Sequence, residues 1–296
     1  MFEKVSPAHP DKMCDRLAGA IVDLAYSKEK NPRIAVEVLA GHGKVFIIIE
    51  TSLSREQLSC AEIDPIVWRI FGNDVEINVT IVPQDPILAH NQDNAMRVGD
   101  NGIFRGVPPT HEQKLLTAIA ASIYDRHPFD GKYIIQGKGR LAAPEFDVTI
   151  CQSHLSREQE PELREHLKNA YGIHLPIINP LGEWTGGPNT DSGATNRKLG
   201  SDLGEGVTGG GLMGKDLSKG DVSINIVAFL KAVQSGQTVT ACCSIGDEHV
   251  TFQYASGKTE TETFADVVEM ARLYILTDCN GSFETFSEWG LIRPKE

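Results

Sequence analysis

Residues 186–221 carry side chains whose types and spacing suit phosphate chemistry. Two acids, Asp191 and Asp221, bracket its four cations, which are Arg197, Lys198, Lys215 and Lys219. Between the two pairs of cations, six of the eleven residues of segment 204–214 are glycine. Glycine lets backbone N–H groups approach a ligand, and cations, amides and Mg²⁺-binding carboxylates are what a polyphosphate site requires. No GxxxxGK[ST] is present, which excludes a Walker loop; a solvated surface loop remains the alternative.

The composition is that of an ordinary globular protein. The chain has 296 residues, of which 41% are hydrophobic and 23% charged, so two or three units are expected. The net charge of −12 argues against a nucleic-acid or anionic-membrane surface. An anion site must therefore be a local basic pocket.

We expect a cytoplasmic protein without a membrane span. No apolar run approaches 18 residues, and the first residues, MFEKVSPAHPDKM, lack the apolar core of a signal peptide. The six cysteines show no CxxC spacing, and the adjacent Cys242 and Cys243 make a disulfide scaffold improbable. Reduced thiols in the cytoplasm are the better interpretation.

The elements that must position this chemistry begin with a helix at residues 9–12, His-Pro-Asp-Lys. Apolar residues follow at helical spacing, proline suits the first helical position, and Asp11 suits the positive end of the helix dipole. A helix N-terminus is also a natural anion site. Whether His9, Asp11 and Lys12 bind a ligand or only begin a helix stays open at this point.

Two strands are predicted at residues 33–39 and 44–51, joined by a hairpin through residues 41–43. Each carries an acid, Glu37 and Glu50. A carboxylate within a sheet is costly unless it is paired or bound to a cation. The alternative is that both acids face solvent on the open side of the sheet.

The order of elements then recurs. A helix capped by Ser54 and Gln57 is predicted to run to residue 71, kinked or interrupted by Pro65, before a strand at 76–82. A second round has a helix at 111–124, strands at 132–136 and 146–152, and a helix to 171 before a strand ending at 179. The pentapeptide LSREQ at residues 53–57 in the first round occurs again at residues 155–159 in the second. A third round has a helix after residue 218, strands at 238–244 and 249–254, and a helix at 263–276, without a visible final strand.

These rounds predict an α/β fold of the α+β type, built from three repeated αββαβ-like units with pseudo-threefold symmetry. The units span residues 1–100, 101–183 and 184–296, and we expect their spatial domains to be interleaved along the chain. The segments between units, 83–109 and 179–214, are rich in Gly, Pro, Asp and Asn, and loops of this kind commonly carry function.

Four motifs, taken together, resemble S-adenosylmethionine synthetase (methionine adenosyltransferase). The family's segments read roughly GHPDK, GAGDQG, GGP-x-x-D-x-G-x-T-x-R-K and GGGAFSGKD-x-x-K-x-D. Here they stand in the same order as AHPDK (8–12), RVGDNG (97–102), GGPNTDSGATNRK (186–198) and GGGLMGKDLSKGD (209–221). The resemblance covers nearly the whole chain, and the family's three-domain fold with internal pseudo-threefold symmetry agrees with the rounds described above.

The resemblance implies an enzyme that joins ATP and L-methionine. The methionine sulfur attacks the ribose C5′, and the released triphosphate is hydrolysed to pyrophosphate and phosphate. A thioether is a neutral nucleophile that needs no general base, so alignment and stabilisation of charge on the departing phosphate are the expected sources of catalysis.

The resemblance also implies roles for individual residues. His9 would lie at the leaving oxygen, and the triphosphate would be lined by Lys12, Lys132, Arg197, Lys198, Lys215 and Lys219. Asp11 and Asp221 would hold Mg²⁺, and Glu37 would hold K⁺. Trp184, in place of the family's Phe, and Ile245 would contact adenine, and Asp130 the ribose. Methionine would be surrounded by Glu50, Gln84, Asp100 and Asp191.

Several departures from the family qualify these expectations. The spacing from Gln84 to Asp100 is a few residues shorter than in the family, which predicts a shortened active-site lid and a broader range of methionine analogues. Met213 replaces the serine expected to help bind K⁺, so K⁺ dependence stays open. The sequence ends at LIRPKE, short of the family's tail, so we expect a homodimer, with active sites at the subunit interface, over a tetramer.

Two other functions remain as alternatives: a nucleotide-binding relative without catalysis, and an enzyme that only hydrolyses ATP or triphosphate. The charged residues that catalysis needs argue against the first. The methionine-side residues Gln84, Asp100 and Asp191 argue against the second.

Overall fold

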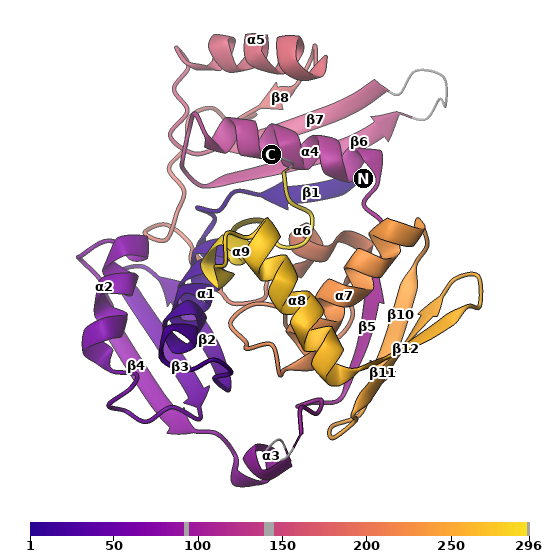
Figure 1. Ribbon diagram of the computed structural model, residues 1–296. Helices are drawn as coiled ribbons and strands as arrows, with labels where there is room; N and C mark the ends of the chain where they lie inside the picture. The colour runs from indigo at the N-terminus through magenta and orange to yellow at the C-terminus, as the bar shows by residue number, and fades with distance from the viewer. Residues whose placement is uncertain (92–94, 139–144, 295–296) are drawn as a thin grey trace.

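The computed structural model describes residues 1–91, 95–138 and 145–294 and contains three four-stranded sheets (Figure 1). The first sheet has the order β4-β3-β2-β9, formed by β2 (Ile34–Gly41), β3 (Lys44–Thr51), β4 (Glu76–Pro83) and β9 (Ser192–Ala194). Within it β3 and β4 are parallel and the other pairs are antiparallel.

The other two sheets repeat this arrangement with one difference. The second sheet, β1-β6-β7-β8, is formed by β1 (Phe2–Val5), β6 (Gly131–Lys138), β7 (Glu145–Gln152) and β8 (Ile177–Ile178), with β7 and β8 parallel. The third, β12-β11-β10-β5, is formed by β5 (Gly102–Gly106), β10 (Val239–Cys243), β11 (His249–Tyr254) and β12 (Thr259–Thr263). It is antiparallel throughout because its edge strand comes from a hairpin before the last long helix.

One strand of each sheet comes from a distant part of the chain. β1 precedes the first long helix but pairs with β6, and β5 precedes the second long helix but pairs with β10. β9, which precedes the third round's helix, pairs with β2. The exchange is cyclic, because each round contributes its first strand to the sheet of the following round.

Two long helices accompany each sheet (Figure 1). They are α1 (Pro10–Lys28) and α2 (Cys60–Phe71), α4 (His111–Tyr124) and α5 (Glu160–Tyr171), and α7 (Gly220–Ser235) and α8 (Phe264–Asp278). The described chain also has three short α-helices, α3 (Pro86–Asn91), α6 (Leu199–Leu203) and α9 (Phe283–Trp289), and a 3₁₀ helix at Gly204–Gly206. The buried faces of these elements form one continuous apolar core.

The sheet faces away from the helices are open. Along β3 the side chains alternate strictly between exposed and buried, as a strand covered on one face requires. Large apolar side chains nevertheless stand on the open face of the first sheet: Leu39, Phe46 and Ile48 are 53%, 45% and 54% exposed. Exposed apolar patches of this kind are typical of interaction surfaces.

The predicted mixed α/β architecture is confirmed, with element boundaries shifted by a few residues. The helix predicted from Ser54 was wrong in its start. Ser54 and Gln57 do cap each other, with the Ser54 N–H donating to Gln57 Oε1 at 2.9 Å, but this closes only a turn. α2 begins at Cys60 behind a second capping box made by Ser59 and Glu62, and Pro65 lies inside it without ending it.

The second LSREQ forms the same turn, with the Ser156 N–H donating to Gln159 Oε1 at 3.0 Å before α5. The two pentapeptides therefore occupy matching positions after β3 and β7. No helix among the described residues is long and apolar enough to cross a membrane, and the six cysteines are free thiols.

Candidate active site

A cleft of ≈ 500 Å³ opens where the second sheet meets the start of α1 and the segment around β9. Eight residues predicted from the sequence line it: His9, Asp11, Asp130, Lys132, Trp184, Asp191, Arg197 and Lys198. They come from segments 9–11, 130–132 and 184–198, which the strand exchange brings together. The cleft thus combines cations, carboxylates, an imidazole and an aromatic ring.

His9 is the N-cap of α1, and its Nδ1 accepts the backbone N–H of Asp11 at 3.2 Å. Burial, followed by the positive charge of Lys198, lowers the pKa of His9 to about 4. The imidazole is therefore neutral at pH 7. With Nδ1 accepting, the ring proton is on Nε2, so His9 offers a neutral N–H donor to the cleft.

Asp11 organises the cations of the cleft. It is only 2% exposed, and its Oδ1 accepts the N–H of Ala194 at 2.9 Å. Lys198 Nζ lies 3.2 Å from Asp11 Oδ2, and Arg197 Nη1 lies 3.5 Å from Oδ1. Gly193 makes this arrangement possible, because a Cβ there would lie 2.2 Å from the carbonyl of Pro10. Two cations are thereby fixed at the helix N-terminus, where an anion is favoured.

Trp184 and Asp130 form the other wall. Asp130 Oδ2 accepts the N–H of Gly187 at 3.0 Å, and burial raises the pKa of Asp130 to about 6. A Cβ at Gly186 would lie 2.3 Å from the Trp184 ring and 2.6 Å from Asp130 Oδ2, so the glycine separates the two. Trp184 is partly exposed and donates Nε1–H to Asn179 at 3.3 Å, which leaves a ring face for stacking.

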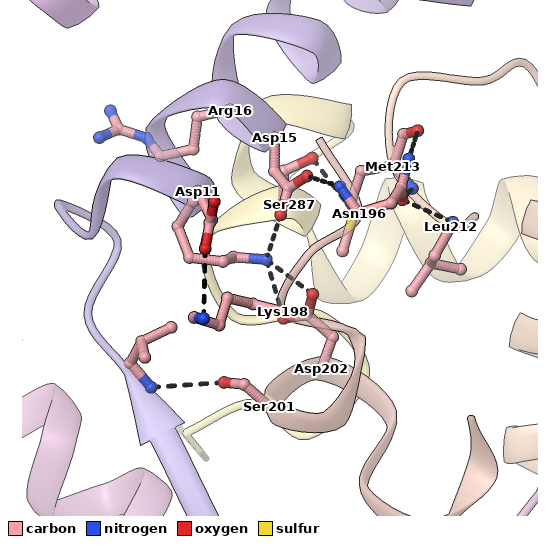
Figure 2. A network of polar contacts seen from close by, with 12 residues as sticks. Asp11, Asp15, Arg16, Asn196, Lys198, Ser201, Asp202, Leu212, Met213 and Ser287 are labelled. Atoms are coloured by element: carbon pink, nitrogen blue, oxygen red, sulfur yellow. Dashed lines mark hydrogen bonds and ion pairs between the residues drawn. The ribbon is translucent and has the colours of Figure 1, made fainter. Parts of the chain in front are cut away.

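Lys12 does not line the cleft. Its side chain is fully buried, and Nζ lies 2.8 Å from both Asp202 oxygens and 3.1 Å from Asp15 Oδ2. Figure 2 shows Asp15 and Asp202 converging from α1 and α6 within this network. Lys12 is thus engaged internally, where it ties the start of α1 to the segment that carries Arg197 and Lys198.

A second group of predicted residues lies outside the lining of the cleft: Glu50, Gln84, Asp100, Lys215, Lys219, Asp221 and Ile245. Backbone pairing and an ion pair connect three of these residues, Glu50, Lys215 and Asp221. Ala35 pairs with Glu50 on one side and with Lys215 on the other, and Lys215 Nζ lies 2.6 Å from Asp221. The predicted residues of one chain thus form two sets.

The second set continues through the loops around Asp100. Ser218, which precedes Lys219, accepts the Gly99 N–H at 3.2 Å, and Asn101 Oδ1 accepts the Ile245 N–H at 2.8 Å. Gln84 extends from the end of β4, where its N–H donates to Thr51 next to Glu50. Its side-chain amide is buried with neither polar atom hydrogen-bonded, which is unusual unless a ligand completes it.

The predicted metal ligands differ in their surroundings. No cluster of three or more His, Cys, Asp or Glu side chains occurs among the described residues. The predicted Mg²⁺ ligands are each paired with cations: Asp11 with Arg197 and Lys198, and Asp221 with Lys215. Mg²⁺ commonly uses one or two carboxylates together with substrate phosphates. Glu37 accepts the hydroxyl of Thr195 on the open side of the first sheet. The Met213 side chain is buried in the core, with Sδ 3.4 Å from Ser287 Oγ (Figure 2).

The structure adds lining residues that the motifs did not single out, namely Cys151, Thr185, Thr190 and Ser192. Cys151 pairs directly with Lys132 across β6 and β7. That register was the available signal, since residues opposite each other on neighbouring strands share a face. The lid segment 84–100 includes residues 92–94, which lie outside the described residues.

Comparison with known proteins agrees with the motifs. The family described as "S-adenosylmethionine synthetase, N-terminal domain" matches residues 1–73. An S-adenosylmethionine synthase of Jannaschia sp. is 29% identical over 272 residues, covering 75% of this chain and 69% of the relative. The S-adenosylmethionine synthase of Mycoplasma mycoides subsp. mycoides SC is 27% identical, and S-adenosylmethionine synthase 2 of Rhodospirillum rubrum 29%; each alignment covers 75% of this chain and 68% of the relative. The predicted resemblance and enzyme class are therefore confirmed.

Proposed function

We propose that this relative of the S-adenosylmethionine synthetases is a methionine adenosyltransferase that makes S-adenosylmethionine from ATP and L-methionine and hydrolyses the released triphosphate to pyrophosphate and phosphate. One observation carries the proposal: a neutral N–H donor, three cations and an aromatic ring face the same ≈ 500 Å³ cleft, formed by His9, Lys132, Arg197, Lys198 and Trp184. The free cysteines suit a reducing cytoplasm.

In the proposed mechanism the cleft binds ATP. Trp184 stacks on adenine, Asp130 accepts ribose hydroxyls, and the cations hold the triphosphate. The Nε2–H of His9 donates to the leaving oxygen on C5′ as charge builds there, which a neutral imidazole does without a proton transfer. Asp11 and Asp221 would hold Mg²⁺, and the bound ion would stabilise the negative charge of the phosphates.

The reaction also requires the second set of residues, which holds three of the four residues expected around methionine and further ones expected for triphosphate, Mg²⁺ and adenine. In the family that the motifs resemble, each active site lies between two subunits, so we propose a homodimer in which a second copy presents Glu50, Gln84, Asp100, Lys215, Lys219, Asp221 and Ile245 to the cleft. The open apolar face of the first sheet, with Leu39, Phe46 and Ile48, supports such an interface. Carboxylates there would favour the positive sulfonium product.

The finer features of the fold belong to the same proposal. We take the three sheets, the matching LSREQ turns and the cyclic strand exchange as a pseudo-threefold repeat of units 1–100, 101–183 and 184–296. On this view the short Gln84–Asp100 segment leaves the methionine side open to larger analogues. K⁺ is not required, because Met213 offers no hydroxyl near Glu37.

The test is incubation with ATP, methionine, Mg²⁺ and K⁺, followed by mass spectrometry and assays of phosphate and pyrophosphate. We expect S-adenosylmethionine with equal phosphate and pyrophosphate. Lys132→Met should lower the rate by roughly a hundredfold or more, as loss of a charge-assisted transition-state contact does. Lys114→Met on the solvent side of α4 removes an equal charge outside the cleft and should leave the rate unchanged.

Other outcomes would replace the proposal. Phosphate release without the sulfonium product would identify a triphosphatase, and stable ATP binding without either product would identify a non-catalytic nucleotide-binding protein. Equal rates of Lys132→Met and Lys114→Met would remove the cleft from the reaction.

A further inference from the structure

A second cavity, of ≈ 150 Å³, lies apart from the cleft and shares no lining residue with it. Its walls come from the end of α1 and the loop after it, from residue 96, from residues 216–218 and from α8. The mechanism proposed above uses none of its side chains. It therefore calls for an explanation of its own.

The cavity is bordered by two guanidinium groups, those of Arg33 and Arg272. Arg272 is held in place by three hydrogen bonds: Nη2 donates to Asn31 Oδ1 at 2.6 Å, Nε to Glu269 Oε1 at 3.3 Å and Nη1 to the carbonyl of Lys30 at 3.4 Å. Its guanidinium also lies 5.7 Å from the centre of the Tyr26 ring, and each Nη keeps one further N–H for a ligand. Arg33 donates Nη1–H to the carbonyl of Ala89 in α3 at 2.8 Å. Fixed arginine forks of this kind recognise carboxylates with two parallel hydrogen bonds.

A buried hydroxyl lies in the same place. Ser218 is 8% exposed and lines the cavity, and its Oγ has no hydrogen-bond partner at good geometry, although its contact with the Asp216 carboxylate is close enough to lower the pKa of that acid. The Asp216 carboxylate already accepts the N–H groups of Ile34 at 2.8 Å and of Ser218 at 2.7 Å. Burial raises the pKa of Asp216.

The rest of the lining is apolar, with Met96, Leu217 and Val268 facing the same space. A cavity with cations at one side and aliphatic walls at the other fits an amphipathic anion. Its volume suits roughly six non-hydrogen atoms, since an engineered cavity of this size holds benzene. We propose that this cavity binds a small aliphatic carboxylate of about four carbons, with its carboxylate on Arg272 and Ser218 and its chain against Met96, Leu217 and Val268.

The position of the cavity gives such a ligand a regulatory role, and this part rests on the proposed function. Ser218 directly precedes Lys219 and accepts the Gly99 N–H next to Asp100. Arg33 holds α3, which belongs to the lid segment. A ligand seated here contacts segments that adjoin the methionine-side residues, and we expect it to change the KM for methionine more than the KM for ATP.

The test uses butyrate as the probe with the full chain, in the absence of ATP and methionine, followed by calorimetric titration and saturation-transfer NMR. We expect saturable binding at one site per chain. Arg272→Gln should weaken binding by roughly ten- to a hundredfold and Ser218→Ala by roughly three- to tenfold, as losses of a charged and a neutral hydrogen bond do. Arg126→Gln, in the turn after α4, makes the same charge change elsewhere and should bind normally.

Ser218→Ala keeps both backbone contacts of residue 218, so it tests the site even where Arg272→Gln disturbs Asn31. Absence of saturable binding, equal binding by all three variants, or displacement of butyrate by methionine or ATP would overturn the proposal. Binding of inorganic phosphate in preference to butyrate would overturn the aliphatic class. Binding is measured without turnover, so a chain that binds butyrate but makes no S-adenosylmethionine separates this inference from the proposed activity.

Discussion

Asp15 and Asp202 share one buried ammonium, and their replacement by asparagine should have unequal effects. Lys12 Nζ is 2.8 Å from both oxygens of Asp202 but 3.1 Å from a single oxygen of Asp15, and all three side chains are fully buried. One carboxylate suffices to balance one ammonium. Burial raises the pKa of Asp15 to about 7, whereas the pKa of Lys12 is raised despite burial because Asp202 lies beside it. Asp202 is therefore the ionised partner.

Asp202→Asn should lower the free energy of unfolding by about 3–5 kcal/mol, because it leaves a buried ammonium without its main counterion. Asp15→Asn resembles the protonated acid and keeps an oxygen for the Asn196 N–H, now 2.8 Å from Asp15 Oδ1. It should cost about 1 kcal/mol at neutral pH. The exposed Asp125→Asn serves as a control of equal charge change.

The pH dependence provides an independent check. The unfolded chain releases the Asp15 proton near pH 4, whereas the folded chain keeps it until about pH 7. The unfolded state thus binds fewer protons across this window, and Asp15 lowers stability as pH rises through it. Asp15→Asn removes this contribution, so its stability relative to the parent should improve from pH 5 to pH 8.

Urea denaturation of the three variants at pH 5, 6, 7 and 8 measures both effects. Equal losses for Asp15→Asn and Asp202→Asn would refute the assignment of the charge to Asp202. A stability difference between Asp15→Asn and the parent that does not change with pH would refute the raised pKa.

Three further predictions concern the reaction. Because burial keeps the His9 pKa near 4, the rate of S-adenosylmethionine formation should show no imidazole titration between pH 5 and 8; a His9-dependent step near pH 6.5, lost in His9→Gln, would contradict the neutral donor. The KM for ATP should rise as pH falls through about 6, where Asp130 gains its proton and stops accepting ribose hydroxyls. Asp130→Asn should have a higher KM for ATP that does not depend on pH in this range. A KM of the parent protein that is constant from pH 7 to 5 would count against the contact. Rates in K⁺ and in Na⁺ should be equal, because Glu37 accepts the Thr195 hydroxyl and Met213 points into the core. Strong activation by K⁺ but not by Na⁺ would show that the protein binds K⁺ after all.

The long, strongly patterned elements were predictable because local rules govern them. Pro10 and Asp11 start α1, the glycines around His42 set the hairpin, and the apolar alternation of residues 44–51 fixes β3. Ser54 misled the prediction because a capping box closes a turn as well as it opens a helix. β12 was missed because its sequence, TETET, has no apolar face, and it is held by pairing with β11.

The sequence named residues that the structure brings together in one cleft, but it did not divide the predicted residues into two sets. Five of the eight that line the cleft lie in the motifs at 8–12 and 186–198, and the resemblance added Asp130, Lys132 and Trp184. Spacing along the chain does not report that Lys12 turns inward to Asp202, since a lysine beside a helix start has the same pattern in either case. Nor does it separate Lys215 from Arg197, which lie in the same segment, 186–221, but belong to different sets.

The cyclic exchange of β1, β5 and β9 makes the three rounds mutually dependent for folding. Cutting the chain near residue 100 or 183 would leave each piece with a foreign strand and with a sheet edge exposed to water, a form that invites aggregation. The ends reinforce this dependence, because Lys4 of β1 donates to the carbonyls of Ser201, Trp289 and Ile292 at 2.8 Å each. Residues 2–5 thus pair with a strand that emerges from the ribosome more than a hundred residues later. The hydrogen bonds of Lys4 are complete only when the last helix is in place. The protein should consequently unfold in one cooperative transition. During synthesis the nascent chain should form no stable partly folded state before its final residues are made.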